Sequence, residues 1–520
     1  MKWIKRIAII VVSLVALLLL ANVGLNWWIS RKLPQIINRE NDTPYQITYK
    51  DIDISLLAHQ MRAKEIVVVP KSSLDSKKQK AGLYAKIESI EVNGFSIWQI
   101  LGSDRIQARS LVVDKPQVIL LKANARAIDN PKSIGSEVVK PFSKVIAVRD
   151  VFLNNGSIKI TGIEKNERIL DVSNVNIKLE GIAITDKTLS QKLPFSFETY
   201  MIDCDSVFYQ SSEYYYLVSK KIETTNHGLN IKGLKVVPEY SRENFIHRIP
   251  MERDWYAIST ANIAINQMNW GFVDEQFGFA AQSVIVDNVN ADIYRNKAPK
   301  DDPKKKKLYS ELLRNLPFAM RVDTLKLLRS RLQYEESLEY GKKPGVLTFS
   351  KFNLYAVGLK SGFAQTKMPD VRIKILCNFM ETSRLDVDWT FNVLDKADRF
   401  NIRGRFFDFP AERLSEFTKP YMNATFKGSL DEVYFNFNGN DEGAKGDFAI
   451  NYDDLKVSIY KKDKPKKKRK FLSAIANLFV KDDTKDKVDN AEISVERNKQ
   501  RSFFNLLWKS LEAGLKEILL

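Results

Sequence analysis

The sequence predicts a mainly β protein: an elongated, curled antiparallel sheet that forms a groove, follows one N-terminal transmembrane helix and ends in short amphipathic helices. Three observations carry this prediction. The chain begins with a long apolar segment, apolar and polar residues alternate with period two through most of its 520 residues, and helical spacing returns at the C-terminus. Hydrophobic residues make up 44% and charged residues 28% of the chain, a composition typical of folded proteins.

The first element is a membrane anchor over residues 7–29, after a short basic head at residues 1–6. The apolar run is about as long as the ~20 residues that cross a bilayer, and Trp27 and Trp28 stand at its far end, where interfacial aromatic residues belong. The alternative is a cleaved signal peptide, but its apolar region would be shorter, about 7–15 residues, and followed by a small-x-small site. The basic head predicts that residues 1–6 stay in the cytoplasm and that the remaining chain is exported.

Alternating strands fill the body of the chain. We divide it into an N-terminal β-groove segment (30–185), a middle β-rich segment (186–310) and a C-terminal β-groove segment (311–460). Strands with one apolar and one polar face predict an antiparallel sheet that covers something apolar on one side. Turn signals between strands include Asn154-Asn155-Gly156 and residues 341–345.

Strict alternation is clearest at residues 433–438 and 455–459. Because successive strand residues point to opposite faces, their apolar members are predicted to share one face. That face would line an apolar trough, and its candidate residues are Val433, Phe435, Phe437, Leu455, Val457 and Ile459.

An internal repeat is visible in the body of the chain. Residues 151–160 align without gaps on residues 325–334, at an offset of 174. Apolar positions between 170 and 179 then align on positions between 347 and 356, at an offset of 177. Each copy predicts a strand, a turn, a strand, a loop and a third strand.

Both ends of the chain carry segments that point to a known family. They are the basic head and single span, and residues 45–57, 66–70, 87–96, 111–118, 446–457 and 503–510. Together these segments resemble AsmA-like proteins, which are relatives of TamB and of the bridge-like lipid-transfer proteins. The resemblance implies a β-groove anchored in the inner membrane of a bacterium with two membranes, with the bulk of the chain in the periplasm. It also implies that the groove shelters phospholipid acyl chains and supports outer-membrane lipid homeostasis, with an outer-membrane or envelope protein as a further partner.

A basic run opens the region 461–501, which we read as a linker with a short apolar helix. Its basic side chains are Lys461, Lys462, Lys466, Lys467, Lys468, Arg469 and Lys470. The run is either a solvated linker or a patch that attracts anionic lipid. Nucleic acid is not the expected partner, because the run lacks the interleaved aromatic residues of a single-strand platform.

Two helices are expected outside the anchor and the linker. One covers residues 307–316, and the other is an amphipathic helix at residues 502–520 with Phe504 and Trp508 on its apolar side. Such a helix either lies in a membrane interface or plugs the end of the sheet.

No enzyme chemistry is expected. The chain has no Gly-x-Ser-x-Gly elbow, Walker loop, His-Glu-x-x-His pair or Cys-x-x-Cys motif. Two cysteines and three scattered histidines are too few for the common metal centres, and no cofactor is expected. The formal charge of +18 suits an acidic surface such as anionic lipid. The rival to a lipid-binding role is an anchored structural or assembly factor for outer-membrane proteins, without lipid cargo.

Overall fold

The computed structural model describes residues 44–55, 58–74, 80–94, 106–123, 146–164, 166–183, 195–273, 276–461, 464–468 and 488–519, with single positions at 23 and 188. Apart from position 23, the predicted anchor lies outside these residues, including Trp27 and Trp28. Lys462, Arg469 and Lys470 of the basic run also lie outside them. None of the helices in the described part of the chain is long and apolar enough to span a membrane.

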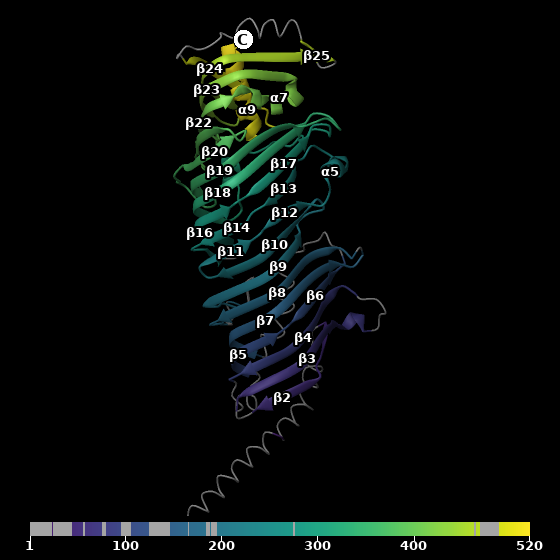
Figure 1. The fold of residues 1–520 in the computed structure, drawn as a ribbon. Coiled ribbons are helices and arrows are strands. Elements are labelled where there is room, and N and C mark those ends of the chain that lie inside the picture. The colour runs from purple at the N-terminus through teal and green to yellow at the C-terminus, as the bar shows by residue number, and fades with distance from the viewer. Residues whose placement is uncertain are drawn as a thin grey trace, which may run out of the picture. The chain divides into compact units, whose positions relative to one another are not determined.

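The fold is mainly β, with 63% of residues in strands and 12% in helices. The strands form a large curled sheet that carries few short helices (Figure 1). The chain divides into two compact units. The N-terminal unit comprises residues up to Ser211 together with Leu217–Asn226, and the C-terminal unit comprises Ser212–Tyr216 and His227–Leu520.

Among the described elements of the N-terminal unit are its strands and one short 3-10 turn, η1 (Lys71–Ser73). Its strands are β1 (Tyr45–Thr48), β2 (Asp51–Ser55), β3 (Gln60–Pro70), β4 (Gly82–Asn93), β5 (Ile106–Asp114), β6 (Gln117–Lys122), β7 (Ile146–Gly162), β8 (Arg168–Glu180), β9 (Thr199–Gln210) and most of β10 (Tyr215–Thr225).

The C-terminal unit adds strands and several helices. Its strands are β11 (Gly228–Lys232), β12 (Lys235–Pro238), β13 (Trp255–Ser259), β14 (Asn262–Asn266), β15 (Asn269–Val273), β16 (Gln276–Asp287), β17 (Asn290–Asn296), β18 (Ala319–Ser337), β19 (Gly345–Lys360), β20 (Val371–Phe379), β21 (Ser383–Phe391), β22 (Phe400–Pro410), β23 (Ala424–Gly439), β24 (Gly443–Lys461), β25 (Lys464–Lys468) and β26 (Asp489–Glu496). Its helices are α5 (Arg242–Arg248), α6 (Tyr309–Arg314), η2 (Ala411–Leu414), α7 (Ser415–Met422) and α9 (Phe503–Leu519).

The sheet was predicted to be antiparallel, but it is mixed, because each unit also contains parallel pairs. Strands β5 and β6 both pair with β7 in parallel, and β16 and β17 both pair with β18 in parallel. In each case a long connection precedes the strand with which both earlier strands pair. Residues 123–145 lead into β7, and residues 297–318 lead into β18. A connection of this length returns the chain to the end at which the previous strands began, which a hairpin cannot do.

The internal repeat is confirmed, since the two copies share their cross-strand pairs. Five pairs between β7 and β8 recur between β18 and β19 at the aligned positions. They are Val151–Leu179 and Leu325–Ala356, Leu153–Ile177 and Leu327–Leu354, Gly156–Val175 and Ser330–Phe352, Ile158–Val172 and Leu332–Phe349, and Ile160–Leu170 and Tyr334–Leu347.

The Asn154-Asn155-Gly156 signal is a β-bulge inside β7 and not a turn between strands. Asn155 has φ of 53°, and its N–H donates to Oδ1 of Asn176 at 2.9 Å. The aligned Arg329 has φ of 51° and donates to Oδ1 of Asn353 at 3.0 Å. Because the extra residue shifts the alternation by one, the apolar residues on both sides of the bulge stay on the same face of the sheet.

Candidate functional site

The N-terminal unit carries a continuous apolar surface, which we call the N-terminal apolar face. Directly opposed residues of β2, β3, β4, β5, β7, β8 and β9 form two unbroken apolar rows across it. The first row is Ile54, Met61, Val92, Leu111, Val151, Leu179 and Tyr200, and the second is Ile52, Ala63, Ile90, Val113, Leu153, Ile177 and Ile202.

Most of this face is only partly buried. A small cluster at the β2 end, formed by Ile52, Ile54, Val92 and Ala108, is buried, but Leu111, Leu153, Ile177 and Ile202 keep part of their surface exposed. In the described residues of this unit, no helix contributes a side chain to that cluster. The alternation therefore produces a long aliphatic surface that the described part of the unit leaves partly open.

The opposite face of the same strands is polar and charged. Lys64 Nζ lies 2.8 Å from Oδ2 of Asp53, and Arg62 pairs with Glu91. Burial acts to raise the pKa of Glu91, but hydrogen bonds from Arg62 and neighbouring amides hold it below its usual range. The N-terminal unit thus has one face suited to water and one suited to hydrocarbon.

In the C-terminal unit the equivalent face changes from partly open to closed. One of its rows begins with Leu229, Ile265, Val284 and Leu325, which are all partly buried. The same row continues through Ala356, Ile373, Trp389, Ile402 and Phe437, and apart from the partly buried Ile373 these residues are buried. The closed part coincides with the helices, because α9 lies against β24 and β26. Figure 1 shows α9 and α7 at this end of the C-terminal unit, beside the strands β22, β23 and β24.

Five of the six predicted trough residues belong to this closed part. Val433, Phe435, Phe437 and Leu455 are buried in one cluster, and Val457 packs against it. The side chain of Ile459 lies outside the described residues. The cluster is covered by apolar residues of α9, namely Leu506, Leu507, Leu511, Leu515 and Ile518. These positions therefore contact protein in this state.

The C-terminal helix is present as expected, and its apolar side packs on the sheet. Trp508 makes an edge contact with the ring of Phe417 in α7, with centroids 5.4 Å apart. Phe504 remains 59% exposed at the N-terminal end of the helix. This arrangement is the plug, which was one of the two alternatives for the helix.

Part of the basic run forms β-strand structure. Lys461 ends β24, and residues 464–468, which include Lys466, Lys467 and Lys468, form β25 and pair with β24. Their side chains lie outside the described part of the chain.

A buried ionic network, which the sequence did not reveal, ties the start of α9 to the strands. The Glu252 side chain is 3% exposed and lies 2.6 Å from Lys297 Nζ, 2.7 Å from Arg501 Nη1 and 3.4 Å from Arg295 Nη1. Arg295 also pairs with Asp254. Burial acts to raise the pKa of Glu252, but these cations outweigh it and lower the pKa to about 2. The members of this network are up to 249 residues apart, so no local sequence pattern could have indicated the network.

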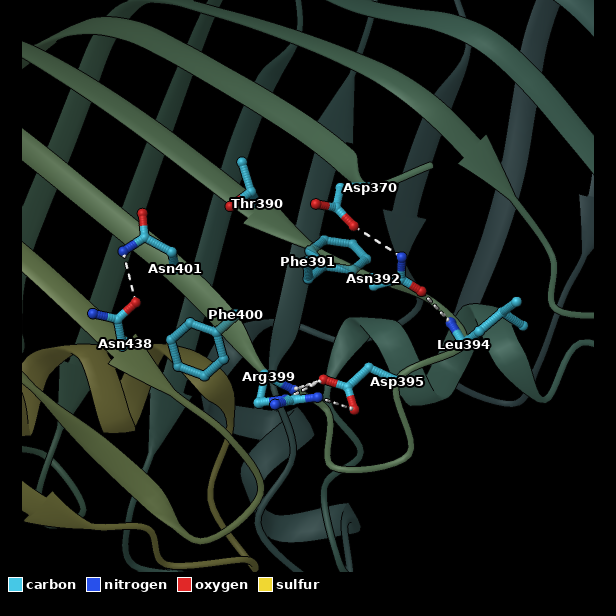
Figure 2. Close-up of a pocket in the computed structure, with 10 residues that line it drawn as sticks. All are labelled: Asp370, Thr390, Phe391, Asn392, Leu394, Asp395, Arg399, Phe400, Asn401 and Asn438. Carbon is cyan, nitrogen blue, oxygen red and sulfur yellow. Dashed lines mark hydrogen bonds and ion pairs between the residues drawn. The ribbon is translucent and has the colours of Figure 1, made fainter. Parts of the chain in front are cut away.

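A shallow polar hollow of about 560 Å³ lies where β21 ends and β22 begins (Figure 2). Its polar groups are paired with one another: Asn392 Nδ2 donates to Asp370 at 2.8 Å, Arg399 Nε donates to Asp395 at 2.7 Å, and Asn401 bonds Asn438. The hydrogen bond from Arg399 holds the pKa of Asp395 below its usual range. These contacts hold the end of β21 and the start of β22 in place.

Among the described residues no group of three or more His, Cys, Asp or Glu side chains could hold a metal ion. Cys204 and Cys377 are both buried free thiols, and burial raises the pKa of each. The partly open apolar face is therefore the candidate functional site. No protein-family model matches the chain, and no curated protein matches it.

Proposed function

We propose that this protein is a membrane-anchored lipid-binding or lipid-transfer protein of the cell envelope, which shelters phospholipid acyl chains on the apolar side of its sheet. The observation that supports this best is the N-terminal apolar face, with its two rows of directly opposed apolar residues, most of which remain partly exposed. Apolar surface left in water costs about 25 cal/mol per Å². Contiguous patches of this kind mark binding surfaces.

Hydrocarbon is the ligand class that suits this face. Its row residues are aliphatic apart from Tyr200, so they provide dispersion and burial and few hydrogen bonds. A linear acyl chain can follow a row across several strands while its polar headgroup remains in water. The charge of +18 favours anionic headgroups at the protein surface.

The cellular setting is part of the proposal. Residues 7–29 anchor the chain in the inner membrane, and the exported remainder forms an elongated groove that supports outer-membrane lipid homeostasis. A reporter fused after Leu520 should be active only in the periplasm. Activity of that fusion in the cytoplasm would contradict the topology.

A second function has its own support. In the C-terminal unit the same kind of face is closed by α9, as an ordinary core would be. If the N-terminal face were also closed by protein, the chain would fit the anchored structural or assembly factor for outer-membrane proteins.

Two adjacent residues of β9 offer a matched test. Ile202 is partly buried in the second apolar row, whereas Met201 is 49% exposed on the opposite face, across from Lys178. The full-length chain is purified in mild detergent, and phospholipid per protein is measured by mass spectrometry. Ile202→Asp should reduce bound lipid several-fold, because a carboxylate on the acyl-chain surface must be desolvated, while Met201→Asp should leave it unchanged.

The outcome separates the two functions. Both variants should keep their circular dichroism spectrum if the face is open. Phe435→Asp provides the contrast, because Phe435 is 4% exposed and an unpaired charge there should unfold the C-terminal unit. Wild-type protein free of phospholipid, or Ile202→Asp that unfolds as Phe435→Asp does, would favour the structural factor.

A further inference from the structure

The hairpin formed by β15 and β16 carries aromatic residues on one side only. Trp270 lies opposite Phe279, and Phe272 lies opposite Phe277. Phe277 also contacts Phe318, the residue before β18, and both the Phe272–Phe277 and the Phe277–Phe318 ring centroids are 5.5 Å apart. We call these five residues the aromatic lip.

The reverse side of the hairpin carries no side chain at its centre. Gly271 lies opposite Gly278, and a Cβ built on either glycine would meet no atom within 4 Å. The apolar area of the hairpin is thus gathered on the side of the lip. Trp270 is 42% exposed and Phe272 is 45% exposed, so this side is not closed as a core is.

The lip continues the partly open apolar face of the C-terminal unit. Phe279 lies beside Met320 in the parallel pair of β16 and β18. Ala281, two residues further along β16, lies beside Val322. Val322 is paired with Leu359, which packs against the buried cluster of this unit. The lip is therefore on the side of the sheet that carries the apolar rows.

We propose that the aromatic lip is an acyl-chain binding subsite, at which hydrocarbon passes between solvent and the apolar rows of the C-terminal unit. This inference rests on the proposed function and adds the place at which the protein holds the acyl chain. The five lip residues are Trp and Phe, which bury large apolar areas, and they include no charged group. A linear hydrocarbon matches a row of rings that leads onto aliphatic rows.

Tryptophan fluorescence gives a direct test, because bromine atoms on an acyl chain quench a tryptophan that they contact. Full-length protein is loaded with phosphatidylcholine brominated along its acyl chains and compared with protein loaded with the unbrominated lipid. Wild type should show a quenched component that Trp270→Phe lacks. Trp255→Phe should retain that component, because Trp255 packs with α5 and its neighbours in a separate cluster.

A second pair of variants tests the same site by lipid content. Trp270→Asp should lower bound phospholipid at least two-fold, while Asn269→Asp, at the adjacent exposed position on the other side of β15, should have no effect. If Trp270→Phe removes no quenching and Trp270→Asp keeps its lipid, the lip is not a binding subsite, although the proposed function stands. If wild type binds no phospholipid at all, both proposals fail.

Discussion

A Cβ atom placed on Gly514 of α9 would lie 2.3 Å from Cγ of Phe448 on β24, which is closer than two carbon atoms can approach. The helix backbone therefore lies directly on this ring. Phe448 belongs to the buried cluster that contains Val433, Phe435 and Phe437. Gly514 thus sets how closely α9 closes the apolar face of the C-terminal unit.

Gly514→Ala should destabilise the C-terminal unit. In an exposed helix interior the same change gains about 1 kcal/mol, but here the added methyl group must displace Phe448 or the helix, which costs about 1–3 kcal/mol. Urea unfolding measures it through the fluorescence of Trp389, whose ring stacks on Phe503 at 4.5 Å. Glu517→Ala, at an exposed position of the same helix, should change stability by less than about 0.5 kcal/mol. A Gly514→Ala protein as stable as wild type would contradict the close approach.

Acid should weaken the attachment of α9 through Glu252. Its pKa in the folded chain is lowered to about 2 and that of an unfolded glutamate is near 4.5. The ionised carboxylate therefore stabilises the fold above about pH 5, and this contribution, on the order of a few kcal/mol, is lost as the pH falls toward 2.

The variant Glu252→Gln isolates this effect. It should be less stable than wild type at pH 7, because Lys297, Arg295 and Arg501 lose their common partner. The stability difference between the two proteins should shrink between pH 5 and pH 3 in thermal melts. A difference that stays constant over this range would show that Glu252 does not titrate as the network requires.

The sequence predicts the strands well and the coverage of their faces poorly. Residues 175–179 and 433–437 show the same alternation, and both form strands with one apolar face. Within the described residues, a helix covers the second face and none covers the first, because α9 supplies the covering residues from a segment about 70 positions further along the chain. Alternation depends on near neighbours, whereas coverage depends on which distant helix packs where.

Parallel pairing was missed for a similar reason. Nothing in the sequence of β5 and β6 distinguishes a strand that pairs in parallel with β7 from one that pairs in antiparallel fashion. The aligned positions of the repeat, by contrast, were predicted to the residue, including the three-residue difference in offset. The prediction of three strands in each copy was wrong, because the expected turn is a bulge and each copy has two strands. Both copies must place apolar residues at the same paired positions, and that requirement is visible in the sequence.

The bulge in β7 gives a test of how the apolar rows are kept in phase. Asn155 has φ of 53°, a left-handed conformation that asparagine and glycine adopt readily and β-branched residues do not. Asn155→Val should therefore destabilise the N-terminal unit by about 1–3 kcal/mol, while Asn155→Gly should be close to neutral.

Lys159→Val provides the control, since it places the same side chain at an exposed position of the same strand where no bulge occurs. Thermal unfolding of the full-length chain compares the three variants. Because Leu153 and Ile158 stay on one face only through the bulge, Asn155→Val should also reduce bound phospholipid, and Lys159→Val should not. Equal stability and equal lipid content in the two valine variants would mean that the phase of the rows does not depend on the conformation of residue 155.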